Sequence, residues 1–310
     1  MGDGLADDTA AIEAAIAAAL GEAGSLRGGR IVFPKGTYRI TRTLTIEQAA
    51  AVVEGVGSVL VWDGPADVPM LRLDSCLGTS VSGLQLVGNA MAPPSAAVSL
   101  RSLKSHPNGS NFNTLSSVSI GYLPEGNADS SGHQFATGIL LEGDDIDGGS
   151  NRFEMMSITG CTAGVHVDRP RFVRNTFLGL RIADCDTAFS TNAGVSTSGT
   201  NWVLSGSTST DIALGRGARL VVKGFASRMS ARLAVTDSSS LTIRDGYWET
   251  GPNIPSDGIA LDGRRGSGRS FLRLEDFDFT GSGGMVPARI VWQPDSQVFL
   301  KNFVGPQNSS

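Results

Sequence analysis

The sequence predicts an all-β chain wound as a parallel β-solenoid, and an internal repeat is the main reason. Residues 151–165 and 175–189 carry nearly the same pattern of Asn, Phe, Ile and Cys, offset by 24 positions. An earlier copy starts at residue 113 and is interrupted after residue 120. Repetition at a period of 20 to 50 residues marks a stack of like units. The 40 Gly residues and many Ser, Thr, Asn and Asp residues suit short strands joined by turns.

The repeat predicts which side chains lie above one another. Neighbouring coils of a solenoid are separated by the spacing of paired strands, about 4.8 Å, so equivalent residues form rows along the axis. We expect three inward rows in the middle of the chain. They are Phe153 over Phe177, Ile158 over Ile182, and Cys161 over Cys185.

The sequence predicts a row of Asn side chains and a row of Cys side chains. Asn113, Asn151, Asn175 and Asn201 are predicted to form an amide ladder at a turn, where each side chain satisfies buried backbone groups. The Cys row is expected to remain as thiols in the core, because a free Cys behaves as a small buried apolar side chain.

The organisation that follows is one domain over residues 1–310. Residues 1–46 would form an N-terminal cap and the first strands, and residues 47–310 the coils, with an insertion at 121–137. A period near 24 leaves room for roughly ten coils, or a rod of about 45–50 Å.

The cap is predicted to contain a helix over residues 10–20. Ile12, Ile16 and Leu20 recur at helical spacing and give one narrow apolar face. Asp8 or Thr9 would be the N-cap, and the glycines from residue 21 onward would end the helix. Residues 28–41 then predict two strands around a Pro-Lys-Gly turn.

These N-terminal motifs resemble a known family. Residues 2–12 are Gly-Asp-Gly-x-x-Asp-Asp-Thr-x-Ala-Ile, and residues 28–40 are Gly-Gly-x-Ile-x-Phe-Pro-x-Gly-Thr-Tyr-x-Ile. Both resemble the cap of pectate-lyase-superfamily proteins, a group that includes polygalacturonase-related proteins, mannuronan epimerases and phage tailspike depolymerases. The resemblance implies a right-handed parallel β-helix with a short helical cap. It leaves the chemistry open, and Asp3, Asp7 and Asp8 are interpreted as turn and cap residues.

Charge and composition limit the partners. The net charge is −5 and no basic stripe occurs, which argues against nucleic acid, and no apolar run is long enough for a membrane span. Three Cys residues do not make a disulfide framework. No signal peptide precedes the abrupt start at Met1, so we expect that a leader or another domain has been removed, in a secreted or phage-particle-associated protein.

Aligning the coils on Gly138, Gly164 and Ala188 predicts a first candidate surface. One outward row would hold Glu142, Asp168 and Asn192, and a second row Leu140, His166 and Ser190; the turn after the first row adds Asp144 and Asp145. Carboxyls one coil apart would lie about 5 Å from each other, near the separation in a retaining glycosidase. Alternatively, Leu-[Glu/Asp]-Gly is only turn chemistry, because Leu261-Asp262-Gly263 repeats it far away.

A second candidate surface lies beside the insertion. Glu154 would face Arg181 of the next coil, with Asp184 at the following turn, as an acid and a cation for an acidic sugar. His133 and Tyr122 in the insertion would contribute to substrate binding. The alternative is that Glu154 and Arg181 are an ordinary cross-strand pair. Trp202 and Trp248 would stack on sugar rings if they were exposed.

These residues favour a polysaccharide-degrading hydrolase that uses a pair of carboxylates and needs no cofactor. The first alternative is a uronate lyase, which needs Arg or Ca²⁺ to neutralise the uronate carboxylate and a base such as Arg, Lys, His or Tyr. The segment Asp168-Arg169-Pro170-Arg171 with Arg174, near His166, would supply these groups. The second is a glycan-binding or structural protein without turnover. The epimerase signature Tyr-Gly-Phe-Asp-Pro-His and the polygalacturonase motifs Asn-Thr-Asp and Arg-Ile-Lys are absent. A homotrimer, as in many tailspikes, is the expected oligomer to test, although no long trimerisation segment follows the coils.

Overall fold

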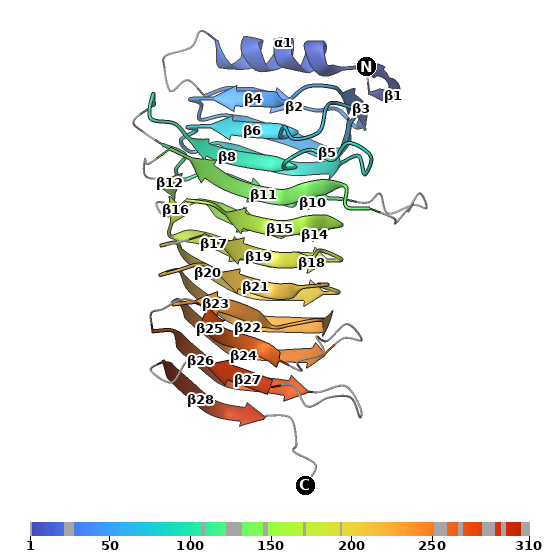
Figure 1. Cartoon of the computed structure of the whole chain (residues 1–310). Coiled ribbons are helices and arrows are strands. Elements are labelled where there is room, and N and C mark those ends of the chain that lie inside the picture. Colours follow the sequence, from blue (N-terminus) through green and yellow to red (C-terminus); the bar gives the residue numbers. More distant parts are fainter. Residues whose placement is uncertain are drawn as a thin grey trace.

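The computed structural model of the chain is an elongated stack of coils with the helix at one end and the C-terminal strands at the other (Figure 1). The structure describes residues 2–21, 28–106, 109–121, 132–144, 148–169, 172–192, 194–250, 259–265, 269–280, 289–292 and 296–304. Within these ranges every strand pair is parallel, so the predicted all-β solenoid, a right-handed parallel β-helix, is confirmed.

Most of one side of the coils is a first sheet with 16 strands in the described ranges. Its strands are β1 (Asp3–Asp7), β2 (Arg30–Val32), β3 (Gly36–Ile40), β5 (Val52–Trp62), β7 (Ser80–Val87), β9 (Thr114–Ser116), β10 (Ser119–Ile120), β13 (Arg152–Glu154), β14 (Ser157–Thr159), β17 (Asn175–Leu178), β18 (Arg181–Ala183), β20 (Ser196–Ser205), β22 (Arg219–Ser230), β24 (Ser240–Thr250), β26 (Phe271–Thr280) and β28 (Gln297–Val304).

A second sheet of ten strands closes the coils in the same ranges. Its strands are β4 (Leu44–Glu47), β6 (Leu71–Asp74), β8 (Val98–Ser102), β11 (Phe135–Gly143), β15 (Cys161–Val167), β19 (Thr187–Thr191), β21 (Thr210–Leu214), β23 (Ala234–Asp237), β25 (Ile259–Arg265) and β27 (Arg289–Trp292). A short pair, β12 (Gly148–Gly149) and β16 (Phe172–Val173), lies at the turn between the sheets.

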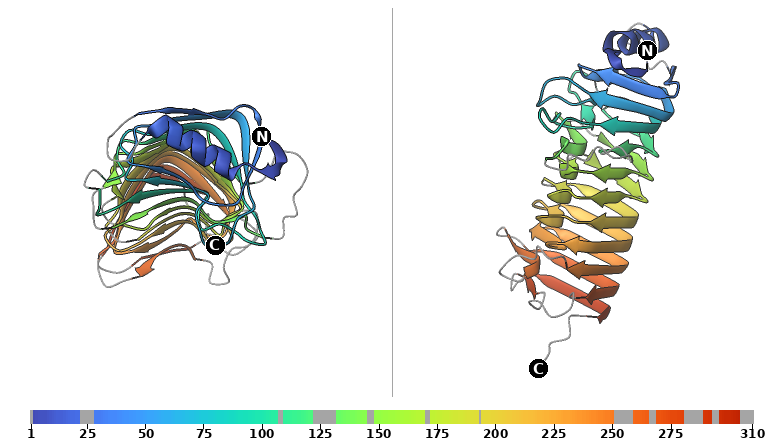
Figure 2. Two further views of the ribbon diagram at one scale, coloured as in Figure 1. Left: turned by 90° about the horizontal axis from the view of Figure 1, so that it is seen from above. Right: turned by 90° about the vertical axis from the view of Figure 1, so that its right-hand side faces the viewer.

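The strands of the first sheet change direction at one residue of each coil, and that residue has a left-handed backbone. Since a side chain with a Cβ strains this conformation, Gly, Asn and Asp are favoured there. The residues in this row of bends are Gly83, Ser117, Met155, Gly179, Asn201, Gly224, Asp245, Asp276 and Asn302. The coils wind around one common axis, as the view from above shows (Figure 2), and the side chains inside them form one apolar cluster.

The predicted inward rows are confirmed. Phe153 pairs with Phe177 and their rings stack 4.4 Å apart. Ile158 pairs with Ile182. Cys161 and Cys185 are free and buried, as a thiol row requires.

The predicted amide ladder is confirmed for three of its four members. Asn151 Oδ1 accepts from the Asn113 backbone N and Nδ2, both at 3.0 Å, and Asn151 Nδ2 donates to Asn175 Oδ1 at 3.1 Å. The prediction for Asn201 is wrong. The coil after Asn175 is shorter, so Thr197 occupies the next position and Asn201 lies exposed in the row of bends.

The N-terminal cap is confirmed in its main features. Helix α1 (Thr9–Leu20) begins after the N-cap Asp8 and ends at Gly21, and it buries Ile12 and Ile16 over the first coil. Asp7 accepts hydrogen bonds from Thr9, which lower the pKa of Asp7 to about 2. Asp7 is therefore a turn residue of the cap. No helix in the described ranges has the length and hydropathy of a membrane span.

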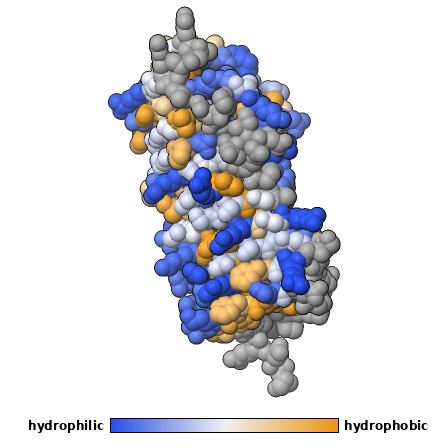
Figure 3. Space-filling model, turned by 90° about the vertical axis from the view of Figure 1, so that its left-hand side faces the viewer, coloured by the Kyte–Doolittle hydropathy of each residue, from blue (hydrophilic) through white to orange (hydrophobic). Residues whose placement is uncertain are grey.

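Hydrophobic side chains on one flank of the stack are scattered among hydrophilic ones (Figure 3). Scattered exposed apolar residues are normal for a protein surface.

Candidate functional site

The first predicted surface exists, and it is longer than the sequence indicated. The strands of the second sheet align Leu141 with Val167 and Val167 with Thr191, which puts Glu142, Asp168 and Asn192 in one row. The pairings of the preceding coils extend that row toward the cap. We call the whole set the charged row; it consists of Glu47, Asp74, Arg101, Glu142, Asp168 and Asn192.

Arg101 lies between two acids of the charged row, Asp74 and Glu142. Its Nε and one terminal nitrogen bind the two oxygens of Asp74 at 2.9 and 2.6 Å, and the Asp74 side chain is only 5% exposed. The bond to Asp74 raises the pKa of Arg101, and the nearby charges of Glu142 and Asp144 add to that effect. Glu142 lies in the next coil, where its Oε1 accepts a 2.6 Å hydrogen bond from Ser99.

Asp168 is held from several sides. Asn192 Nδ2 donates to its Oδ1, and the Arg169 Nε lies 3.2 Å from its Oδ2. The Nε2 of His166 is 3.9 Å from Asp168 Oδ1. These contacts place an amide and two basic side chains around one carboxylate at the end of strand β15.

His166 lies in the second outward row, between Leu140 and Ser190, as predicted. Its Nδ1 is 2.8 Å from Ser190 Oγ. Burial lowers the pKa of His166, and the charge of Asp168 only partly opposes this effect. The imidazole is therefore neutral at pH 7 and able to accept a proton.

The Leu-Asp-Gly segment at Leu261 does not repeat the Glu142 position. Leu261 pairs with Ala234, and through that row it is equivalent to Ile139. Asp262 consequently lies in the row of His166, with Arg232 at 3.8 Å. The two Leu-acid-Gly segments look alike in sequence, but Leu261 is equivalent to Ile139 and not to Leu141. The segment at Leu261 is therefore shifted by two residues along its strand.

The second predicted surface is divided by the row of bends. Glu154 precedes the bend at Met155 and binds Arg152 of its own strand, and its partners in adjacent coils are Ser116 and Leu178. Arg181 follows the bend and pairs with Ser157. Among the described residues, the ion pair of Glu154 is with Arg152 and not with Arg181.

The remaining predicted residues are placed separately. Asp184 is exposed and has a left-handed backbone at a corner of the coil. His133 lies 3.6 Å from Asp186, and Asp144 accepts from the backbone of Lys104 at 2.9 Å. Tyr122 and Asp145, with most of the insertion, lie outside the described residues.

Trp202 and Trp248 are fully buried, so neither can stack on a sugar. Both point into the core because inward and outward positions alternate along a strand. Among the described residues no group of three or more His, Cys, Asp or Glu side chains could hold a metal ion.

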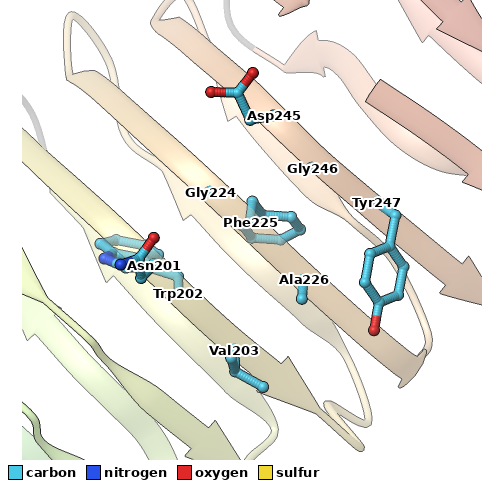
Figure 4. Close-up of a pocket in the computed structure, with 9 residues that line it drawn as sticks. All are labelled: Asn201, Trp202, Val203, Gly224, Phe225, Ala226, Asp245, Gly246 and Tyr247. Carbon is cyan, nitrogen blue, oxygen red and sulfur yellow. The ribbon is translucent and has the colours of Figure 1, made fainter. Parts of the chain in front are cut away.

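The first sheet also carries a groove that was not predicted from the sequence (Figure 4). It crosses β20, β22 and β24, has a volume of about 460 Å³, and is open to solvent. Its lining residues are Asn201, Trp202, Val203, Gly224, Phe225, Ala226, Asp245, Gly246 and Tyr247. Because inward and outward side chains alternate along a strand, the inward Trp248 implies that Tyr247 faces outward. Its small neighbour Ala226 is 21 positions away in the chain, so the sequence alone does not show that the two residues form a groove.

Comparisons with known proteins agree with this fold. A family model described as rhamnogalacturonase A/epimerase, pectate lyase-like, matches residues 1–105. No curated protein matches the chain.

Solved structures match over the whole length. The endo-xylogalacturonan hydrolase of Aspergillus tubingensis is similar over 100% of this chain and 92% of its own, with 13% identity and a TM-score of 0.66. The enzymatically active domain of tailspike protein 2 from bacteriophage CBA120 is similar over 95% of this chain and 45% of its own, with 10% identity and a TM-score of 0.67. The Dettilon tailspike protein is similar over 97% of this chain and 66% of its own, with 12% identity and a TM-score of 0.54.

These likenesses define the class: the chain folds as a right-handed parallel β-helix. Residues 1–105, which hold the N-terminal motifs, match a pectate-lyase-like family model, in agreement with the resemblance that those motifs predicted.

Proposed function

We propose that the protein degrades a polysaccharide by hydrolysis, with Glu142 and Asp168 as the two carboxylates. The observation that carries this proposal is their position in adjacent coils of the charged row. Adjacent coils are about 4.8 Å apart, and retaining glycosidases hold their carboxyl groups about 5–5.5 Å apart. The similarity to a solved endo-xylogalacturonan hydrolase supports the same kind of substrate.

The contacts of the two acids suggest their roles. Asp168, which accepts from Asn192 and contacts Arg169, is assigned as the nucleophile that attacks the anomeric carbon. The glycosidic C–O bond breaks as Glu142 gives its proton to the departing oxygen. Glu142 then takes a proton from water, the water oxygen replaces Asp168 on the sugar, and both groups return to their first state.

A product assay tests the proposal. The protein is incubated with a panel of acidic and neutral polysaccharides, and new reducing ends are measured. Glu142→Gln and Asp168→Asn are expected to lower the rate about 10²–10⁴-fold with unchanged circular dichroism. Asp276→Asn, an exposed acid in the row of bends, is the matched control and should keep full activity. Full activity in both row variants would reject the site.

A second candidate is β-elimination on a uronate polymer. It is favoured by the neutral His166 close to Asp168 and Arg169, because a lyase needs a base and a cation for the uronate carboxylate. In this case, His166→Gln would be inactive and the products would absorb in the ultraviolet at their unsaturated ends. Glycan binding with no products after long incubation would instead indicate a binding protein.

We also propose a homotrimer as the working assembly. Chains packed side by side would add residues of a neighbour to the charged row. The molecular mass in solution, measured by light scattering, tests this directly, and a monomer at assay concentration would reject it.

A further inference from the structure

The groove on the first sheet has the construction of a ligand site. Its floor is formed where three neighbouring coils carry small or apolar residues next to the row of bends. Val203, Ala226 and Tyr247 are direct neighbours in one outward row, so the small Ala226 leaves a hollow beside the Tyr247 ring (Figure 4). Val203 is 45% exposed, which gives the groove an apolar surface that solvent reaches.

At two glycines of the floor an added Cβ would come too close to a neighbouring atom. A Cβ on Gly224, which has a φ of +70°, would lie 2.6 Å from Asn201 Oδ1. A Cβ on Gly246 would lie 2.8 Å from the carbonyl oxygen of Phe225. Larger residues would therefore force the strands or the Asn201 amide to move, and the groove would be lost.

Polar groups lie along the edge of the groove at the bends. Asn201 and Asp245 are both exposed, with left-handed backbones at φ of 56° and 53°. Asp245 is the one charged residue of the described lining, and the exposed Lys223 lies 4.0 Å from it. Arg228 stacks on the Tyr247 ring at 5.3 Å from its centroid, which restricts the ring.

We propose that this groove binds a neutral saccharide chain, at a site separate from the charged row. A pyranose presents apolar C–H faces and a rim of hydroxyls, which match an apolar floor with an aromatic wall and a few polar groups. Asn201 can donate and accept, and Asp245 can accept two hydroxyl hydrogen bonds. A uronate would bring a second carboxylate to Asp245, which favours neutral sugars.

The dimensions agree with this occupant. The bends at Asn201, Gly224 and Asp245 belong to three successive coils, so the edge extends over about 10 Å at the coil spacing. Each coil step is close to the length of one pyranose unit. The groove therefore suits two or three sugar residues that run along the axis of the stack.

The site is independent of the proposed catalysis. The groove lies on strands β20, β22 and β24 of the first sheet, whereas the charged row lies on the second sheet and ends at Asn192. Binding at the groove can thus be measured in a chain in which Glu142 is replaced. A failure of this inference would leave the hydrolase proposal standing, and the reverse is also true.

The experiment measures binding in the Glu142→Gln background by calorimetry. The probes are cello-, malto- and galacto-oligosaccharides, with oligogalacturonate as the acidic comparison. We expect at least one neutral series to bind, with affinity rising up to about three sugars, and to bind more tightly than the oligogalacturonate. Tyr247→Ala and Ala226→Leu, which remove the wall and fill the hollow, should each weaken binding at least about tenfold.

Phe112→Ala is the matched control, because it removes an aromatic ring that is 63% exposed outside the groove. Tyr247→Phe keeps the ring and should keep most of the affinity, which distinguishes loss of the wall from misfolding. The inference is overturned if no neutral probe binds at about 10 mM. It is also overturned if Ala226→Leu binds normally, or if the binding that Tyr247→Ala weakens is tighter for the acidic probe than for every neutral probe.

Discussion

Asp211 is an ionisable side chain buried inside the solenoid. Its Oδ1 accepts from Ser207 at 2.8 Å and its Oδ2 from Ser227 at 2.6 Å, while Ser230 lies 3.1 Å from Ser227. Burial raises the pKa of Asp211 to about 6, and the serine hydrogen bonds only partly offset that effect. In an unfolded chain an Asp titrates near 3.9, so the folded protein holds this proton more tightly.

This difference predicts how stability depends on pH. Because the folded pKa is the higher one, the contribution of Asp211 to the free energy of unfolding is largest below about pH 4 and decreases as the pH rises to about 6. The total change is on the order of 3 kcal/mol. Asp211→Asn should remove this slope, since an amide does not ionise and the serine hydroxyls can rotate to match it.

The measurement is the melting temperature of both proteins between pH 4 and pH 8. Asp211→Asn should gain stability relative to the natural chain as the pH rises, with the gain complete above about pH 7. The other carboxyl groups titrate in both proteins, so their effects cancel when the two melting temperatures are subtracted. If the difference in melting temperature stays constant from pH 4 to pH 8, Asp211 is not the group that titrates.

The amide ladder gives a second prediction at the scale of one residue. Asn151 is 1% exposed and has hydrogen bonds to Asn113, to Asn175 and to the carbonyl of Ser110. Asn151→Ala leaves these partners buried without a replacement, so we expect the free energy of unfolding to fall by about 2–4 kcal/mol. Denaturant titration measures the loss. Asn192→Ala, the exposed amide, should cost less than about 1 kcal/mol, and equal losses would contradict the ladder.

At the scale of the strand, the left-handed bends set which residues are tolerated. Gly179 is a clean position for testing this, because it has a φ of +66° and nothing closer than 3.7 Å to an added Cβ. Any cost of substitution therefore comes from the backbone. We expect Gly179→Asn to be nearly neutral, Gly179→Ala to cost about 1 kcal/mol, and Gly179→Val to cost more.

The order of the three substitutions is the decisive result, and denaturant unfolding measures it. A β-branched side chain adds crowding near the backbone, whereas Asn adopts the left-handed conformation more readily than other residues. If Val and Asn cost the same, the bend is not held in the left-handed region. Gly28 is the opposite case. There an added Cβ would lie 2.8 Å from the carbonyl oxygen of Ala50, so the cost of a substitution comes from this close contact.

The strands also explain what could be predicted from the sequence. The row through Phe153 was predicted correctly because the coil to Phe177 has 24 residues, the period of the repeat. The row through Glu142 was predicted correctly although its coil to Asp168 has 26 residues, because Gly138 and Gly164 fix the alignment of the two strands. Asn201 was misplaced because the next coil has 22 residues at this turn. Asp74 and Arg101 were not predicted to belong to the charged row, because the sequences of their coils do not resemble the repeat. Only the pairing of their strands shows that they extend this row.

For the whole molecule, the sequence predicted the stack and one outward row, but it did not predict the groove. An outward residue of a solenoid is adjacent to residues one coil away, and coil lengths vary with the turns. The groove beside Ala226 and Tyr247 is formed by three successive coils, so predicting it would require the lengths of the turns in all three. Inward rows repeat the same residues and can be read from the sequence, whereas a binding surface uses different residues in each coil.

The stack as a whole depends on its covered end. The α1 side chain of Ile16 packs over the first coil, where it meets Ile31, Phe33, Leu44 and Ile46. In a repeat protein each coil contacts only its neighbours, so damage at one end stays near that end unless the coils are strongly coupled. Ile16→Asp would place a charge on the apolar end, which we expect to cost about 2–5 kcal/mol.

Amide hydrogen exchange of Ile16→Asp distinguishes local from global loss. We expect faster exchange in β2, β3 and β4, close to the cap, and unchanged protection in β20 and β22, because the intervening coils retain their own contacts. Ala14→Asp adds the same charge on the exposed side of α1 and is the control, with little expected change. Equal loss of protection along the whole chain would show that the coils unfold as one unit, and that the helix then stabilises the distant charged row and groove as well as the first coil.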